Sequence, residues 1–221
     1  NIADLVRLED RHRLRVGVIG CGDWGRNHVR TLKSLGALAG VADMDSARLG
    51  EVAKEFDCPT MRPSELIASD EIDAVVLALP ADRHVEVSLS VLEAGKHLLV
   101  EKPMALEVAG ATAIVETARR AGVVAMTGHV LRFHPAFEAL EQMVNSGTLG
   151  RIRYVYSTRI GLGKFFVQTD ALWDIAPHDL SLLFAITGEM PVSTHLEGAA
   201  MITDAPDFAH LHMRFASGTR S

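Results

Sequence analysis

Lys102 follows an apolar run that we expect to be a buried strand, with Glu101 between them, and Pro103 comes next. Proline restricts the residue before it to extended backbone, so the lysine side chain has a defined direction. An ammonium group in such a place stabilises negative charge developing on a substrate oxygen and favours the alkoxide form of a hydroxyl. A surface lysine before a proline turn fits the position equally well, so position alone leaves both interpretations open.

Asp174 and His178 form the second group suited to proton chemistry. They lie four residues apart at the start of a helix expected over 175–186, so they share one helix face. Asp174 is expected to cap this helix and Pro177 to lie in its first turn. An imidazole titrates near neutral pH and is suited to take a proton from a hydroxyl. The alternative is a helix cap beside a packed histidine.

A glycine turn supplies the third candidate. Gly20, Gly22 and Gly25 follow an apolar strand and fit the G-x-G-x-x-G fingerprint of dinucleotide binding. The first glycine permits the turn, the second lets a pyrophosphate approach the backbone, and the third lets the next helix pack closely. That helix, expected over 24–35, would aim its free amides and positive dipole end at the phosphates.

Asp43 closes the next expected strand, about 20 residues past the glycines, where such folds place an acid that binds the adenosine ribose. A turn residue or helix cap is the alternative, and Asp45 could equally serve as that cap. No arginine immediately follows Asp43 to hold a 2′-phosphate, although Arg48 is close by. We therefore expect NAD as the cofactor and keep NADP as the less favoured alternative.

The elements that must position these residues alternate between strand and helix. This pattern predicts a doubly wound parallel sheet, an α/β Rossmann domain over residues 1–130, with ligands beyond the carboxyl ends of the strands. The expected strands are 16–19, 37–43, 60–61, 74–79, 97–100 and 123–126, and the expected helices are 24–35, 45–56, 64–68, 82–93 and 107–121.

The pattern changes after this, and residues 131–221 are expected to form an α+β domain for substrate binding and oligomerisation. Polar and apolar residues alternate over 151–158 and 209–215, and a further strand is expected over 192–201, which together indicate a mostly antiparallel sheet. The last four residues are expected to form a hairpin turn ahead of a further strand, so we expect either that this domain is truncated or that something else covers the open sheet edge. His210 and His212 share a face, but no third ligand stands out, and we expect no metal site.

Composition bounds the class of protein. With 221 residues, 48% hydrophobic and 23% charged, the chain is typical of a globular protein. A net charge of -6 gives no basis for nucleic-acid binding, and there is no apolar run long enough for a membrane span. The first twelve residues lack the apolar segment of a signal peptide, and two cysteines make no disulfide framework, so a cytoplasmic location is expected.

Four motifs occur together in one order along the chain. They are 20–25, Glu101-Lys102-Pro103, Arg132-Phe133-His134-Pro135 and 174–178. In this the chain resembles the glucose-fructose oxidoreductase/inositol dehydrogenase (Gfo/Idh/MocA) family over nearly its whole length. The resemblance implies that Lys102 is the catalytic lysine, that His178 is the base, and that Asp174 binds or orients the substrate hydroxyl.

The resemblance also extends the expected cofactor site. His84 fits the histidine of a loop under the dinucleotide, Glu101 would lie beside the cofactor ribose, and His129 stands where asparagine is often found, which leaves that contact open. The residues expected to bind the cofactor are Gly20, Gly22, Asp23, Trp24, Gly25, Asp43, Leu79, Pro80, His84, Glu101, Lys102 and His129.

The leading hypothesis is an NAD(P)-dependent dehydrogenase that oxidises a secondary alcohol of a sugar, cyclitol or nucleotide sugar. The Trp-Asp-x-x-Pro-His-Asp form of 173–179 resembles UDP-N-acetyl-hexosamine 3-dehydrogenases within the family. A non-catalytic dinucleotide-binding sensor of the same fold is the main alternative, and an enzyme that recycles a tightly held cofactor is a third. The loop 161–166 is expected to reach the substrate, and an exposed face of the second sheet is expected to form a homodimer or homotetramer.

Overall fold

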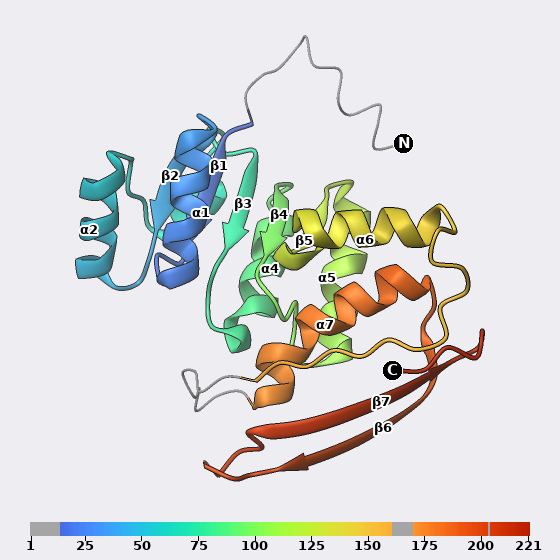
Figure 1. Cartoon of the computed structure of the whole chain (residues 1–221). Coiled ribbons are helices and arrows are strands. Elements are labelled where there is room, and N and C mark those ends of the chain that lie inside the picture. Colours follow the sequence, from blue (N-terminus) through green and yellow to red (C-terminus); the bar gives the residue numbers. More distant parts are fainter. Residues whose placement is uncertain (1–13, 161–169, 203) are drawn as a thin grey trace. The chain divides into compact units, whose positions relative to one another are not determined.

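This computed structural model describes residues 14–160, 170–202 and 204–221. The chain forms two compact units that divide between Gly128 and His129 (Figure 1). Within the parts described, none of the helices has the length and apolar character needed to cross a membrane.

The first unit is built on a parallel sheet in the order β2-β1-β3-β4-β5. Its strands are β1 (Val16–Ile19), β2 (Leu38–Ala42), β3 (Ala74–Leu77), β4 (His97–Val100) and β5 (Ala125–Thr127). Because β2 lies on one side of β1 and β3 on the other, the chain reverses its direction of winding at β1. This is the doubly wound topology that the sequence predicts.

Helices cover both faces of this sheet. Val16 and Val18 point to one face and pack with residues of α1 (Asp23–Ser34) and α2 (Ser46–Phe56). Ile19 and Leu77 belong to the core on the other face, which α3 (Pro63–Ala68), α4 (His84–Glu93) and α5 (Val108–Ala121) cover. Strands buried on both sides explain the nearly continuous apolar runs in the sequence.

The strand expected at 60–61 does not form. Thr60 makes a single parallel bridge to Val41 of β2, and the chain then enters α3 at Pro63. Pro59 contributes its carbonyl to the Val41 amide but has no N–H of its own to extend the ladder. Pro59 and Pro63 therefore limit this segment to a single bridge with β2.

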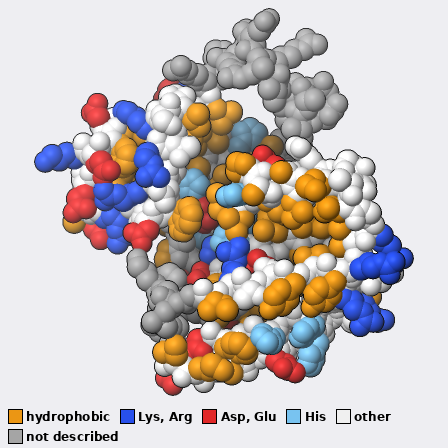
Figure 2. Space-filling model, viewed as in Figure 1, with side chains coloured by type: hydrophobic (Ala, Val, Ile, Leu, Met, Phe, Trp, Pro, Cys, Tyr) orange, Lys and Arg blue, Asp and Glu red, His pale blue; other side chains and the backbone are white. Residues whose placement is uncertain are grey.

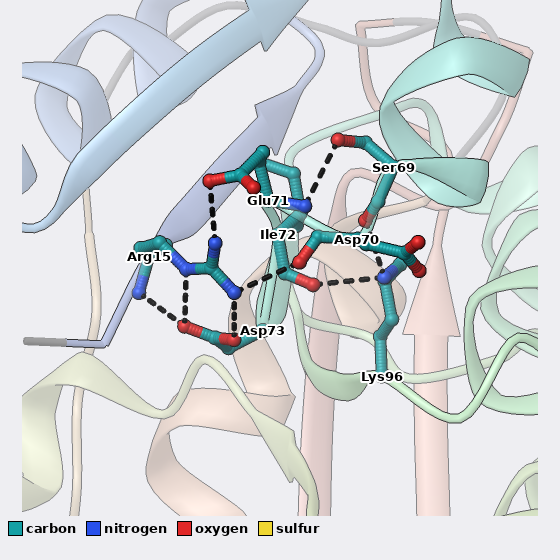
Figure 3. A network of polar contacts seen from close by, with 7 residues as sticks. All are labelled: Arg15, Ser69, Asp70, Glu71, Ile72, Asp73 and Lys96. Carbon is teal, nitrogen blue, oxygen red and sulfur yellow. Dashed lines mark hydrogen bonds and ion pairs between the residues drawn. The ribbon is translucent and has the colours of Figure 1, made fainter. Parts of the chain in front are cut away.

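A polar network ties the amino ends of three neighbouring strands together (Figure 3). Arg15, Asp73 and Lys96 each stand one residue ahead of β1, β3 and β4. Arg15 donates to both carboxylate oxygens of Asp73 from its side chain, at 2.8 and 3.1 Å, and its guanidinium also holds Glu71. These contacts lower the pKa of Asp73 to about 2. Lys96, only 8% exposed, donates to the carbonyls of Ser69 and Ile72 at 2.8 Å each.

The second unit combines helices with an antiparallel pair of strands. Its elements are the short helix η3 (Val130–Phe133), α6 (Pro135–Asn145), α7 (Ala171–Thr187), β6 (Pro191–Ala199) and β7 (Phe208–Phe215). Leu183 of α7 packs with Met213 and Phe215 of β7 to form its core. The predicted alternation over 209–215 is confirmed, because these inward residues are separated by exposed polar ones.

Two local expectations in this unit are wrong. Residues 151–158 do not form a strand, and Tyr154 makes only a bridge to Arg220. Helix α7 begins a turn earlier than expected, and its cap is Asp170, which accepts a hydrogen bond of 2.8 Å from the Trp173 amide. Asp174 is therefore inside the helix and not its cap, and Pro177 lies in the helix interior.

The hairpin turn expected at the last four residues does form. Gly218 has a positive φ of 89°, and Ser221 exchanges two hydrogen bonds of 3.0 Å with Met213 of β7. The left-handed conformation at the turn favours glycine, as the sequence supplies.

Candidate functional site

The carboxyl ends of the strands line up in one row. Ile19, Leu77, Val100 and Thr127 are in register across β1, β3, β4 and β5. Each ladder continues one residue further, with the bonds Gly20 N to Ala42 O, Ala78 N to Ile19 O, Glu101 N to Leu77 O and Gly128 N to Val100 O. The glycine turn, Glu101 and Lys102 therefore leave the sheet at the same edge, which we call the carboxyl edge.

The three glycines of the turn meet different structural requirements. A Cβ on Gly20, which has a φ of +96°, would lie 2.3 Å from the Ala78 carbonyl oxygen, and one on Gly25 would lie 1.8 Å from the Gly20 carbonyl oxygen. The protein's own backbone excludes side chains at both. A Cβ on Gly22 would meet nothing within 4 Å, and its backbone is ordinary extended chain. The space beside Gly22 is a cradle that fits a pyrophosphate close to the backbone.

Helix α1 starts directly behind this space. Its N-cap is Gly22, which has no side chain to cap the helix. The amides of the first helical turn and the positive end of the helix dipole suit an anionic group at this point. The turn and the helix together meet the requirements of a diphosphate.

Asp43 lies beyond β2 and faces the same turn. One carboxylate oxygen accepts a hydrogen bond of 2.7 Å from the Cys21 amide, and the other accepts one of 2.8 Å from the Asp45 amide. The cap of α2 is Asp45, which accepts from the amides of Ala47 and Arg48. Asp43 is thus not the helix cap, and Arg48 lies 3.4 Å from its carboxylate.

A cavity of about 690 Å³ opens between these elements. It brings together six of the predicted cofactor residues with an arginine from α2 and another beside α4. Its lining is Ile19, Gly20, Gly22, Asp23, Asp43, Met44, Asp45, Arg48, Pro63, Ala78, Leu79, Pro80, Arg83 and Val87. Trp24, Gly25, His84, Glu101, Lys102 and His129 are not part of that lining.

The predicted residues outside the cavity have other surroundings. Trp24 is 49% exposed on α1, and Gly25 serves the packing of α1 against the turn. His84 is buried beneath the loop that follows β3, and Glu101 is half-buried beside α1. His129 is the first residue of the second unit and the N-cap of η3.

His28 is a residue of this region that the sequence analysis does not identify. Its Nε2 lies 2.7 Å from a carboxylate oxygen of Glu101, although the two residues are 73 positions apart. The sequence feature that could have identified His28 is its position three residues after Gly25, which puts the two residues on a similar face of α1.

Asp174 and His178 both lie on α7 in the second unit, one turn apart, as predicted. On the same helix, Asp179 binds the segment that precedes it in the chain, because its carboxylate accepts hydrogen bonds of 2.7 Å from Ser157 and from Arg159. The loop 161–166, expected to reach the substrate, lies outside the described residues.

His210 and His212 occupy the exposed face of β7. The His210 ring lies against Phe208, with 4.7 Å between ring centroids, and against His212 at 6.3 Å. Across the ranges that the structure describes, no three His, Cys, Asp or Glu side chains are grouped to hold a metal ion.

Comparison with known proteins agrees with this geometry. Residues 14–129 match the sequence model of an oxidoreductase family with an NAD-binding Rossmann fold (GFO_IDH_MocA), and residues 137–221 match the GFO/IDH/MocA C-terminal domain. The chain belongs to the Gfo/Idh/MocA oxidoreductase family. The resemblance and the fold class predicted from the sequence are confirmed, and NAD is the cofactor of the Rossmann domain, as expected.

The relatives within the Gfo/Idh/MocA family include named dehydrogenases. UDP-N-acetylglucosamine 3-dehydrogenase of Acidithiobacillus ferrooxidans is 35% identical over 93% of this chain and 64% of its own length. Myo-inositol 2-dehydrogenase of Thermotoga maritima is 28% identical over 93% of this chain and 66% of its own. A solved structure of the Acidithiobacillus enzyme matches with a TM-score of 0.81 and 33% identity, covering 94% of this chain and 65% of that one. The chain thus spans about two thirds of the length of these relatives.

Proposed function

We propose that this protein is an NAD-dependent dehydrogenase that oxidises a secondary alcohol of a sugar, cyclitol or nucleotide sugar. The observation that carries the proposal is the shared carboxyl edge, where Lys102 leaves β4 in register with the glycine turn after β1. The named dehydrogenases among its relatives support the same reaction class.

The cofactor and each site residue have one role in this proposal. When bound, NAD would supply the acceptor for the hydride that leaves the carbinol carbon of the substrate. Gly22 and Asp43 hold the diphosphate and the adenosine ribose of the cofactor. Lys102 stabilises the alkoxide through its ammonium group, and His178 takes the hydroxyl proton. Asp174 orients the substrate hydroxyl.

We infer that the substrate is a nucleotide sugar of the UDP-N-acetyl-hexosamine type. The 35% identity to a UDP-N-acetylglucosamine 3-dehydrogenase supports this, as does the Trp-Asp-x-x-Pro-His-Asp form of 173–179. Of the inositol 2-dehydrogenases, one matches at a lower identity of 28% and another at 35% over only 68% of this chain, which makes a cyclitol the second choice.

The test follows the absorbance of reduced nicotinamide while NAD and a panel of alcohols are offered. The panel holds UDP-N-acetylglucosamine, UDP-N-acetylgalactosamine, myo-inositol and free N-acetylglucosamine. Turnover restricted to the nucleotide sugars supports the proposal, and turnover with myo-inositol alone overturns the substrate assignment. NAD binding without turnover on any alcohol would favour the non-catalytic sensor. Nucleotide released from the denatured protein would favour the enzyme that recycles a tightly held cofactor.

We also propose that residues 1–130 bind the dinucleotide and residues 131–221 serve substrate binding and subunit contact. Exposed apolar side chains on the two-stranded sheet support a homodimer or homotetramer, and Figure 2 shows hydrophobic and histidine side chains together on this part of the surface. Val192, Leu196 and Phe208 are exposed apolar side chains of these two strands. Light scattering coupled to size exclusion tests the state of assembly. Two unpaired cysteines, Cys21 and Cys58, accord with the proposed cytoplasmic location.

A further inference from the structure

Lys102 is flanked by two residues that histidines hold in place. On one side, the Glu101 carboxylate meets His28 of α1, and on the other, the Pro103 carbonyl meets His84 at the start of α4. Both histidines belong to the first unit, and neither lines the cavity. Their contacts are made to the neighbours of the lysine in the chain, one position before it and one after.

The Glu101 carboxylate, which contacts His28 one position before the lysine, lies in a narrow space. His28 Nε2 lies 2.7 Å from Glu101 Oε1, and the second carboxylate oxygen accepts a hydrogen bond of 3.2 Å from the Lys102 amide. The Glu101 side chain is 12% exposed. A Cβ on Gly128 would lie 2.9 Å from Oε1, so the end of β5 leaves room for this carboxylate and for little else. The carboxylate is thus fixed between α1 and β5 while it orients the lysine amide.

The contact after the lysine joins two loops of the carboxyl edge. His84, only 1% exposed, has Nδ1 at 2.7 Å from the Pro103 carbonyl oxygen and Nε2 at 2.8 Å from the Leu79 carbonyl oxygen. Carbonyl oxygens only accept hydrogen bonds, so a ring protonated on both nitrogens donates to both and a neutral ring donates to one. The ring therefore links the turn after β4 to the loop after β3.

We propose that His28 and His84 are positioning residues that fix the Glu101-Lys102-Pro103 turn from both sides. The elements they come from are the ones that surround the cofactor space. Helix α1 starts at the glycine turn, and Leu79 lines the cavity. The two histidines thereby set the position of the Lys102 ammonium relative to the dinucleotide. The effect on kcat rests on the proposed function. The effect on the rigidity of the Glu101-Lys102-Pro103 turn does not.

The test measures amide hydrogen exchange at residues 100–104 of the protein without ligand, and then turnover. In His28→Leu and His84→Leu the Lys102 amide should exchange at least about tenfold faster, because the first variant frees its acceptor, the Glu101 carboxylate, and the second frees the neighbouring Pro103 carbonyl. The kcat should fall by about 10²-fold, the scale expected when a reacting group moves by about 1 Å, while NAD binding changes little. His28→Gln and His84→Gln keep a donor on the side chain and should recover most of both losses.

His97→Leu is the matched control. The His97 ring accepts a hydrogen bond of 3.0 Å from the Val124 amide at the opposite edge of the same sheet, so this variant removes a histidine of similar type far from the turn. It should leave exchange at 100–104 and kcat unchanged.

The proposal is overturned if exchange at 100–104 rises no more in the two leucine variants than in His97→Leu, or if it rises and kcat stays at the wild-type value. If a leucine variant does not fold, the glutamine variants carry the test, because each must then keep the slow exchange of the wild type. Absence of turnover in the wild type would count against the dehydrogenase assignment alone, because the exchange measurement needs no substrate.

Discussion

The Asp43 carboxylate accepts a hydrogen bond of 2.7 Å from the amide of Cys21, the residue between the first two glycines of the turn. The acid at the end of β2 therefore fixes the turn after β1 as well as lining the cavity. The acid proposed to bind the ribose and the turn proposed to bind the phosphates form one connected structure. Changes to Asp43 should affect both.

Asp43→Ser should weaken NAD binding by about ten- to a hundredfold, the range of a lost hydrogen bond to a charged group. The same change should improve binding of NADP relative to NAD, because the carboxylate no longer repels a 2′-phosphate and Arg48 is already in the cavity. Titration with both dinucleotides measures this. Adding Arg48→Gln should abolish the gain for NADP, and a gain that persists in the double variant would contradict the role of Arg48.

Gly22→Ala and Gly25→Ala should separate ligand binding from folding. A methyl group added at Gly25 would lie 1.8 Å from the Gly20 carbonyl oxygen, so overpacking should lower the free energy of unfolding by about 1–3 kcal/mol. A methyl group added at Gly22 meets no protein atom, so stability should change by less than about 1 kcal/mol, while NAD affinity falls at least about tenfold. Denaturant unfolding and calorimetry of NAD binding check both. Equal losses of stability in the two variants would refute the distinction.

Lys102→Ala and His178→Ala should each lower kcat by about 10²–10⁴-fold, the usual contribution of a positioned acid, base or electrostatic group. Binding of NAD should be retained, because neither side chain lines the cavity. If the two groups serve the same hydroxyl, the double variant should lose much less than the product of the single losses. Steady-state kinetics with a substrate found in the panel tests this. A variant with wild-type turnover would remove that residue from the mechanism.

Asp73→Asn should change how stability responds to acid. Arg15 holds the pKa of Asp73 at about 2, below its value in the unfolded chain. The stabilisation is therefore complete above about pH 4 and is lost as the pH falls toward 2. The difference in unfolding free energy between the wild type and the variant should shrink over that window. Asp70→Asn is the control, since Asp70 contacts Arg15 through its backbone carbonyl, and a similar acid response there would argue against the assignment.

The sequence predicts the first unit well because its signals are local. Strands such as Val16–Ile19 are apolar throughout, the helices that cover them have their own stop signals, and glycines occur where the backbone needs them. The site residues at the ends of β1, β2, β3 and β4 follow from topology, since parallel strands bring their carboxyl ends to one edge.

Several features that the sequence analysis predicts wrongly or misses depend on more than the local pattern. Residues 151–158 alternate like a strand, yet alternation creates no strand without a neighbour, and among the described residues Tyr154 pairs with Arg220 alone. Asp170 and Asp174 are both competent caps, and the cap is Asp170, whose carboxylate accepts from the Trp173 amide. The His28–Glu101 contact joins residues 73 positions apart, so no local pattern reports it.

The polar contacts of Arg15, Asp73 and Lys96 (Figure 3) lie at the amino ends of β1, β3 and β4, opposite the carboxyl edge. They tie neighbouring strands together at the end of the sheet away from the candidate site. Substitutions in the loops of the carboxyl edge leave these contacts intact, so those loops can vary in sequence while the framework of the sheet is kept.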